Sequence, residues 1–460
     1  MDLEMLRRQA VNRRSFVRGG VATGMSLVSL DVLAACGGET SSNTGPVTVT
    51  VTDKPGQADK AGSALYNQQV AAFQKLHSHY KIVAHNYFFD PATYYARFAG
   101  HQAEDAVRVY LTEPQYMISH HFVADVSDLV KQWQYFSSIA PSMIKAISDQ
   151  SGRIYAMPRD GYKLSLVYNR KVFQQAGLDP DKPPTTWDDF KGYARQIAGK
   201  GVAGFMPLTT ANQGGWHFTN WLYTAGGKAE TQQNGKWVPS FNSPQGAAVL
   251  QMLKDMRWKD HSIGEKVLVD GGVAYQALGK GSVGMIIGGG GDLAGFHNDF
   301  KTPVDQFGVG PVPTNGGDGV LGGGNVWVFN PGASQDVIQG AIDWIEYHDL
   351  DLKNFEDNLK TQAAAGTAIG YPDNSAFTGT YAQQRNEIIK KYANIPQNVI
   401  QAYLTANQSI VPEPPFYTQQ FYALMDPVVQ KALSDQSFDP QKALDDVASS
   451  FQPTLDQANA

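Results

Sequence analysis

Several groups of residues in this chain have the types that catalysis or metal binding requires, but not the spacing. Asp188 and Asp189 could suggest paired catalytic acids, yet adjacent helix positions point about 100° apart. Two histidine pairs lack the i, i+4 spacing of a helical zinc pair, so we expect solvated surface side chains: His77 with His79, and His120 with His121.

The sequence also lacks the motifs that are typical of nucleotide binding and ester hydrolysis. The glycine runs 288–291 and 322–324 lack the GxxxxGK[ST] spacing of a phosphate-binding loop. No GxSxG nucleophile elbow is present in the sequence. These patterns therefore predict neither a metal site nor a bound cofactor, and they single out no catalytic residue.

Composition and charge exclude further classes. The 460 residues are 42% hydrophobic and 17% charged, a globular profile, and their number suggests two or more compact units. The net charge of −6 and the absence of a Lys/Arg-rich stripe argue against nucleic acid as a partner. The single cysteine, Cys36, excludes an intrachain disulfide, a CxxC redox pair and a thiolate zinc cluster.

The first 45 residues resemble an export signal. Arg13 and Arg14, followed by Ser15 and Phe16, are similar to the twin-arginine motif, although the general secretory route stays open. Residues 33–37, Leu-Ala-Ala-Cys-Gly, resemble a lipobox, in which Cys36 is lipidated and becomes the mature N-terminus. The alternative for Cys36 is a free thiol in a disordered tail. We expect an exported protein, lipid-anchored at the outer face of the cytoplasmic membrane.

Strands and helices alternate after this segment. The predicted elements are a strand at 47–52, a helix at 64–76, a strand at 80–84, a helix at 94–103 and a strand at 105–111. Such alternation favours a parallel sheet with right-handed crossovers. Asp53 and Lys54 follow the first strand at its carboxyl end, where open α/β sheets place their ligands.

Residues 164–193 form the most informative stretch. Leu164, Leu166 and Tyr168 alternate with smaller or polar neighbours, which predicts a half-buried strand. A short helix should follow and end at Gly177, which tolerates φ > 0. Thr186 is the predicted N-cap of the next helix, with two aspartates in its first turn.

The order of residues in this stretch resembles the YNxxxFxxAGLxxPPxTWxE(D)F segment of extracellular solute-binding proteins of sugar-type ABC importers. Five other segments also resemble motifs of this family: residues 126–129, 152–158, 275–287, 307–313 and 322–325. The resemblance covers nearly all of residues 46–460. It implies an α/β fold of the two-lobe periplasmic-binding-protein type II, each lobe a mainly parallel sheet flanked by helices, with a hinge between the lobes.

The resemblance also implies where the lobes begin and end. Lobe one is expected at 46–158 plus 322–371, and lobe two at 159–321 plus 372–460, after the signal and tether at 1–45. The ligand should lie between the lobes, with aromatic rings against the C–H faces of a sugar and polar groups bonding its hydroxyls.

Eleven residues at strand ends and lobe crossings fit this inventory. They are Asp53, Lys54, Glu113, Asp160, Tyr162, Asn212, Trp216, Asp292, Asn325, Trp327 and Tyr371. The alternatives are a solvated turn for Asp53 and Lys54, a core position for Trp216 and a bare turn for Asp292. Trp221 is expected in the core. The tryptophan that the family often carries after the strand at 283–287 is replaced here by the glycine run 288–291.

The resemblance implies capture without chemistry: a monomer binds a carbohydrate, expected to be an oligosaccharide, and the closed form docks on an ABC permease with cytoplasmic ATPases. One rival is an exported glycoside hydrolase using carboxylates such as Glu113 and Asp160. The other is a binding protein for a polyol, a polyamine or glycerol phosphate.

Overall fold

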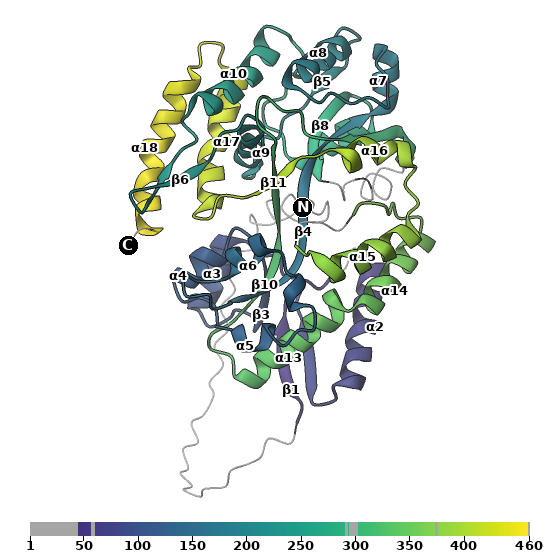
Figure 1. Ribbon diagram of the computed structural model, residues 1–460, viewed down its shortest axis with the longest axis vertical. Coiled ribbons are helices and arrows are strands. Elements are labelled where there is room, and N and C mark those ends of the chain that lie inside the picture. The colour runs from purple at the N-terminus through teal and green to yellow at the C-terminus, as the bar shows by residue number, and fades with distance from the viewer. Residues whose placement is uncertain (1–44, 57–59, 290–292, 294–301, 373–375, 459–460) are drawn as a thin grey trace, which may run out of the picture.

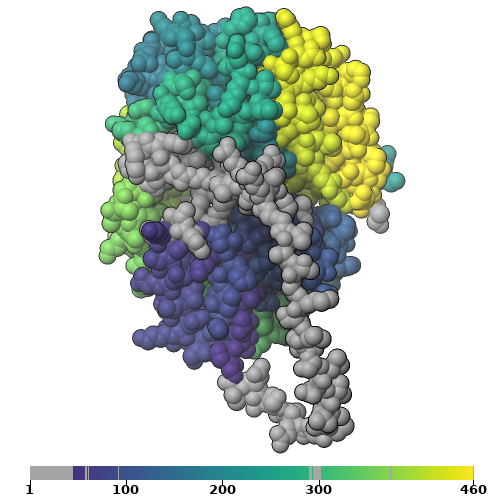
Figure 2. All heavy atoms as spheres, turned by 180° about the vertical axis from the view of Figure 1, so that it is seen from behind, coloured from purple at the N-terminus to yellow at the C-terminus, as the bar shows by residue number. Residues whose placement is uncertain are grey.

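The chain folds into two bodies joined by two long strands (Figure 1). The computed structural model describes residues 45–56, 60–289, 293, 302–372 and 376–458. The space-filling view from behind shows the N-terminal elements in one body and most of the C-terminal helices in the other (Figure 2). We call these bodies lobe one and lobe two.

The strands of the described residues are distributed over both lobes. They are β1 (Val47–Val51), β2 (Tyr80–Ala84), β3 (Ala106–Tyr110), β4 (Ala156–Asn169), β5 (Ala203–Phe205), β6 (Glu230–Gln233), β7 (Lys236–Pro239), β8 (Val283–Gly289), β9 (Phe307–Gly310), β10 (Gly319–Phe329) and β11 (Ser409–Pro412).

Helices lie between these strands along the chain. They are α2 (Lys60–Leu76), α3 (Pro91–Ala99), α4 (Pro114–Ser119), α5 (Ser127–Val130), α6 (Pro141–Ile147), α7 (Arg170–Ala176), α8 (Trp187–Ala198), α9 (Gln213–Thr224), α10 (Pro244–Trp258), α11 (Gly271–Gly279), α13 (Gln335–Ile345), α14 (Leu352–Ala364), α15 (Gly379–Tyr392), α16 (Gln397–Thr405), α17 (Thr418–Ser434) and α18 (Pro440–Ala458). Shorter turns are η1 (Phe136–Ser138), η2 (Val304–Gln306) and the π-helical η3 (Glu346–Leu350).

One sheet runs through both lobes. Its strand order is β2-β1-β3-β10-β4-β8-β5, with β11 beside β10 and β9 beside β4. The pairs β1–β2, β1–β3, β5–β8 and β10–β11 are parallel, whereas β10 and β4 run antiparallel to each other. The first part of β4 pairs with β10, and its last residues pair with β8 and β9. The crossing strands therefore belong to both lobes.

Each lobe has its own hydrophobic core. Val49, Val107 and Trp344 belong to the core of lobe one, whereas Phe190 and Trp221 belong to the main core of lobe two. Trp221 is 1% exposed, which confirms its predicted core position. A further cluster in lobe two covers the opposite face of β4 and β8. The predicted two-lobe α/β class is confirmed.

Alternate residues of β4 enter different cores. Leu166 packs in the main core of lobe two, and its neighbour Val167 packs in the cluster on the opposite face. The strand is therefore buried on both faces, not half-buried as the alternation predicted. The small residues between its large ones fill space under a second layer of helices.

Local signals in the next segment are confirmed. Gly177 ends α7 with φ of 76°, in the left-handed region. The hydroxyl of Thr186 accepts a hydrogen bond from the Asp189 amide at 3.1 Å and caps α8. The helix expected at 94–103 begins earlier, at Pro91, because Asp90 caps it and proline favours the first helical position.

Candidate ligand-binding site between the lobes

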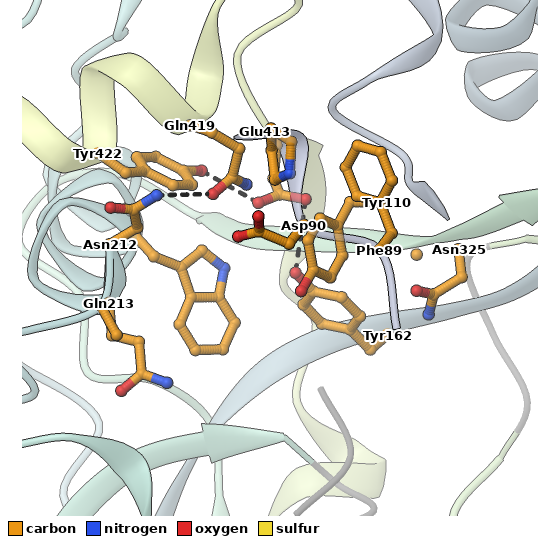
Figure 3. A pocket seen from close by; sticks show the side chains of 14 residues that line it. Phe89, Asp90, Tyr110, Tyr162, Asn212, Gln213, Asn325, Glu413, Gln419 and Tyr422 are labelled. Carbon is orange, nitrogen blue, oxygen red and sulfur yellow. Dashed lines mark hydrogen bonds between the residues drawn. The ribbon is translucent and has the colours of Figure 1, made fainter. Parts of the chain in front are cut away.

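A pocket lies where the two lobes face each other across β4 and β10 (Figure 3). It holds about 730 Å³ of empty space, part of which is open to solvent. Both lobes and both crossing strands contribute to its wall. The lining residues are Phe89, Asp90, Pro91, Tyr110, Tyr162, Ala211, Asn212, Gln213, Trp216, Gly324, Asn325, Glu413, Gln419 and Tyr422.

Lobe one supplies a wall of aromatic rings and one carboxylate. Phe89 and Asp90 follow β2 and lead into α3, and Asp90 Oδ1 accepts the Thr93 amide at 3.0 Å. Tyr110 ends β3 and meets Phe89 edge-on at 5.8 Å between ring centroids. Capping holds Asp90 in place, since the helix start fixes its direction.

Lobe two supplies the first turn of α9. Asn212 precedes this helix, and Gln213 and Trp216 lie in its first turn. Asp426 of α17 holds the helix start, because its carboxylate accepts the amides of Asn212 at 2.8 Å and Gly214 at 2.8 Å. An anion at the positive end of a helix is a favourable arrangement.

The floor of the pocket comes from the crossing strands and the segment before α17. Tyr162 lies on β4 and Asn325 on β10. Glu413 accepts hydrogen bonds from Tyr422 at 3.1 Å and from Tyr162 at 3.4 Å. A Cβ at Gly323 would collide with the Glu413 carboxylate and the Tyr162 hydroxyl, so glycine permits this close approach.

Three buried side chains of the pocket each have a polar atom without a hydrogen-bond partner among the described residues. These atoms are Nε2 of Gln213, Nε1 of Trp216 and Oδ1 of Asn325. Their residues are 2%, 5% and 6% exposed, respectively. Unbonded buried polar atoms are costly. Each of these atoms is out of contact with solvent, so a ligand hydroxyl would reach the two donors and the acceptor only after neighbouring side chains move.

A second pocket of about 620 Å³ adjoins the first and shares Pro91 and Gln419 with it. Glu113 lines it, 6% exposed, and accepts hydrogen bonds from Tyr95 at 3.1 Å and Thr112 at 3.2 Å. Burial raises the pKa of Glu113 to about 7, against the effect of these two bonds. Burial likewise raises the pKa of Glu413 to about 7.

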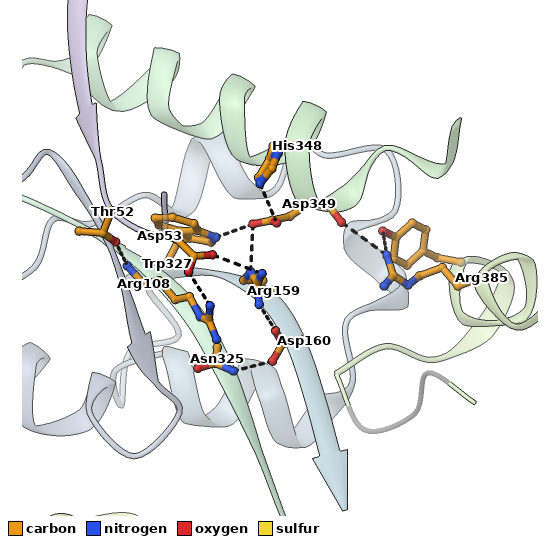
Figure 4. A network of polar contacts seen from close by, with 11 residues as sticks. Thr52, Asp53, Arg108, Arg159, Asp160, Asn325, Trp327, His348, Asp349 and Arg385 are labelled. Carbon is orange, nitrogen blue, oxygen red and sulfur yellow. Dashed lines mark hydrogen bonds and ion pairs between the residues drawn. The ribbon is translucent and has the colours of Figure 1, made fainter. Parts of the chain in front are cut away.

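A network of charged groups lies beside the pocket (Figure 4). Asp53 pairs with Arg108 at 2.6 Å and with Arg159 at 3.3 Å, and Arg159 also pairs with Asp160. Burial alone would raise the pKa of Asp53, but Arg108 and Arg159 hold it below its ordinary value. Asp349 forms an ion pair with Arg159 at 3.4 Å, so both arginines are paired with carboxylates.

The pKa of Asp160 is also held below its ordinary value, because the charge of Arg159 outweighs burial. Its second oxygen accepts Nδ2 of Asn325 at 2.7 Å. Asp160 therefore orients a pocket side chain from behind. The network joins the segment after β1 to β3, β4, β10 and η3, and it fixes the crossing strands to lobe one.

The structure distributes the predicted residues over three environments. Tyr162, Asn212, Trp216 and Asn325 line the pocket, and Glu113 lines the adjoining one. Asp53 and Asp160 belong to the charged network. Three other predicted residues lie elsewhere. Trp327 is in the core of lobe one and donates a hydrogen bond to Asp349 at 2.7 Å; Tyr371 packs edge-on against Tyr403; and the backbone amide of Lys54 donates to the His85 carbonyl. Asp292 lies outside the described residues.

Sequence reasoning missed ten of the fourteen residues that line the pocket. Phe89 and Asp90 follow the strand at 80–84, so the rule that selected Asp53 could have found them. Glu413 directly follows β11, and Gln419 and Tyr422 lie on α17, but the proline- and aromatic-rich stretch at 412–422 shows no strand pattern from which to select them. Only the fold brings this distant segment onto the crossing strands.

Two features of the described residues bear on other classes of protein. Across the part of the chain that the structure describes, no group of three or more His, Cys, Asp and Glu residues could hold a metal ion. Within the same residues, every helix is too short or too polar to cross a membrane. Arg13, Arg14 and Cys36 lie outside the described residues.

Known proteins share both sequence and fold with this chain. The sn-glycerol-3-phosphate-binding periplasmic protein UgpB of Escherichia coli K12 is 25% identical over 268 residues, which are 55% of this chain and 59% of that protein. The chain thus spans less than two thirds of the length of this curated relative.

Two solved structures have the same fold. A solute-binding protein of an ABC transporter from Thermotoga lettingae TMO, bound to α-D-tagatose, aligns with a TM-score of 0.70 at 17% identity, over 90% of this chain and 100% of that one. UgpB from Mycobacterium tuberculosis, in complex with glycerophosphocholine, aligns with a TM-score of 0.71 at 16% identity, over 91% and 100%.

The family itself is shown by sequence. Residues 57–348, more than half of the chain, match the family described as bacterial extracellular solute-binding protein. The match includes β4, α7 and α8, the segment whose motif predicted this relationship. That prediction is confirmed: the chain belongs to the bacterial extracellular solute-binding protein family.

Proposed function

We propose that this chain captures a carbohydrate between its lobes and delivers it to the permease of an ABC importer. One observation carries the proposal: the pocket between the lobes combines aromatic rings with buried polar atoms that lack partners. Rings suit the C–H faces of a sugar, and the free donors and acceptor suit its hydroxyls.

Side chains of lobe two already touch lobe one at the pocket edge. Nε2 of Gln419 donates to the hydroxyl of Thr112 at 3.4 Å. The rings of Tyr417 and Tyr116 meet edge-on at 5.5 Å. A ligand held by both lobes binds the closed arrangement better and shifts the population toward it. The closed form is what the permease, with its cytoplasmic ATPases, would recognise.

The domain boundaries expected from the sequence remain part of this proposal. The sequence predicts lobe one at 46–158 plus 322–371 and lobe two at 159–321 plus 372–460, and we keep these bounds except over residues 372–395. Two buried aromatic residues beyond the second crossing, Phe377 and Tyr381, pack in the core of lobe one, and Ile395 packs in lobe two. The exchange of lobes near this crossing therefore extends over residues 372–395.

Location and assembly complete the proposal. The chain is exported under the signal that contains Arg13 and Arg14, is lipidated at Cys36 and acts as a monomer. Extracellular location in general follows from the family. Family and structural neighbours are binding proteins, so the hydrolase alternative is not favoured. We propose that the chain leaves its ligand unchanged.

A thermal-shift screen over a carbohydrate panel tests the proposal. A ligand at about 100 times its Kd adds about 2.7 kcal/mol to the free energy of unfolding. Each stabilising sugar is then incubated with the protein and analysed by chromatography. Stabilisation with unchanged sugar is expected; conversion to product would show an enzyme, and a panel without any stabilising member would refute carbohydrate capture.

A further inference from the structure

The charged side chains among the described residues that line the pocket are all acidic. Asp90 and Glu413 are its ionisable acids, and among the described residues that line it there is no Lys, Arg or His. The two nearby arginines, Arg108 and Arg159, already pair with aspartates of the charged network. Neither carboxylate of the pocket has an ion-pair partner among the described residues.

The adjoining pocket repeats this composition. Glu113 is the charged residue of its lining, again without Lys, Arg or His in the described part. The two pockets share Pro91 and Gln419 and lie side by side; we call them together the groove, and each of them holds a buried or partly buried glutamate. Tyr95 and Thr112 bond Glu113, and two tyrosines bond Glu413.

Aromatic rings surround both glutamates. Tyr162 and Tyr422 lie against Glu413 in the first pocket (Figure 3), and Tyr95 lies against Glu113 in the second. The negative face of an aromatic ring attracts a cation, most strongly where water is excluded. Hydroxyl donors on a buried carboxylate leave its charge uncompensated, whereas a ligand cation would compensate it.

We propose that the groove selects an amino-oligosaccharide, in which ammonium groups on neighbouring sugar units pair with Glu413 and Glu113. The inference rests on the proposed carbohydrate capture and narrows its ligand class. Phosphorylated ligands are disfavoured, because the described lining offers carboxylates and no cation to an anion. This separates the chain from the ligand named for its Escherichia coli relative.

Matched sugars test the proposal by isothermal titration calorimetry at pH 7. The β-1,4 disaccharides of glucosamine, glucose and N-acetylglucosamine differ only in an ammonium, a hydroxyl or an acetamide at carbon 2. Galactosamine with galactose gives a second matched pair. We expect the amine of a set to bind about tenfold more tightly than its neutral counterparts, as a charge-assisted hydrogen bond allows.

Glu413→Gln and Glu113→Gln keep side-chain size and remove the charge. Each should bring the ratio of amine to hydroxyl dissociation constants toward one. Glu346→Gln is the matched control, since burial also raises the pKa of Glu346 to about 7 but its side chain lines a different pocket. The ratio should not change in this control.

The wild-type protein alone decides between the outcomes. If no amine binds more tightly than its hydroxyl counterpart, the inference is overturned, whatever the variants do. If neutral sugars of the wider panel bind in that case, carbohydrate capture stands without the cationic preference. If no sugar of any kind binds, both proposals fail.

Discussion

Trp216 combines two roles that the sequence left as alternatives. It is 5% exposed and belongs to the main core of lobe two, yet it also lines the pocket. Its ring meets that of Tyr162 edge-on at 6.0 Å and 77°. A ring at the first turn of α9 can be packed from behind and still present one edge to the space between the lobes.

Replacing the indole by phenyl separates these roles. Trp216→Phe should weaken binding of a stabilising sugar about fivefold, because the Nε1 donor is lost and a hydrogen bond contributes about 1 kcal/mol. Titration calorimetry measures the loss. Trp221→Phe, in the core beside Trp187, is the control: it should lower the melting temperature and leave the dissociation constant unchanged. If Trp216→Phe and the wild type bind the sugar equally well, the ligand does not bond Nε1 of Trp216.

Glu413 should make amine binding depend on pH. Its carboxylate must be charged to pair with an ammonium, and burial raises its pKa to about 7. Affinity should therefore fall as pH is lowered from 7 to 5, by up to about tenfold per pH unit. The titratable groups around it are Tyr110, Tyr162, Tyr223, Tyr422 and Glu113.

The tyrosines stay protonated in this range, because burial raises the pKa of each. Glu113 titrates near the same pH, so the double variant Glu413→Gln/Glu113→Gln should abolish the slope. Calorimetry at pH 5, 6 and 7 supplies the measurement. A slope of the opposite sign would mean that the ligand pairs with the protonated acids.

Among the elements, the crossing strands explain the glycine run at 322–324. A Cβ on Gly324 would collide with the backbone oxygen of Asp160 on β4, and one on Gly322 would collide with Ile410 of β11. Backbone atoms cannot move aside as a flexible side chain does. The glycines therefore let β10 lie close to both neighbours where the chain passes between lobes.

Gly324→Ala should reduce the free energy of unfolding by about 1–3 kcal/mol, the usual cost of overpacking. Gly192→Ala is the matched control: this glycine lies inside α8 with no atom within 4 Å of an added Cβ. It should gain roughly 0.5–1 kcal/mol from helix propensity. Urea unfolding measures both. Equal stability of Gly324→Ala and wild type would show that β10 can shift along β4.

At the scale of the whole molecule, the buried acids outside and inside the pockets act together. Burial raises the pKa of Glu113, Glu346 and Glu413 to about 7 and that of Glu230 to about 8. The folded state therefore binds protons that the unfolded state, with an ordinary value of 4.5, has released. The contribution of these four acids to the free energy of unfolding is fully present below pH 4.5 and is lost as the pH rises toward 8.

Thermal unfolding without ligand should show this loss of stability with rising pH. The melting temperature is expected to fall between pH 5.5 and pH 8, as scanning calorimetry can measure. Asp53 and Asp160 do not interfere, because their lowered pKa values matter only at more acidic pH. His217 and His348 act with the opposite sign up to about pH 6.5, because burial lowers their pKa, but these two groups are outnumbered by the four acids. Glu230→Gln, away from both pockets, should reduce the slope. A melting temperature that rises over this range would contradict the account.

The sequence by itself determined the family, the two-lobe class and the local elements, because caps, glycine ends and strand patterns are short-range signals. Thr186 and Gly177 show this: each acts on a helix directly beside it. It also found Tyr162, Asn212, Trp216 and Asn325, which lie at strand ends, at a helix start or on lobe crossings.

Only the tertiary structure decided which polar residues face the pocket and which pair with one another. Asp53 and Asp160 follow the same sequence rule as pocket residues, but two partly buried arginines, Arg108 of β3 and Arg159 of β4, neutralise them. Glu413 reaches the floor from a segment about 250 residues beyond Tyr162 in the chain. Charge pairing and long-range closure depend on distances in space, which neighbouring residues along the chain do not encode.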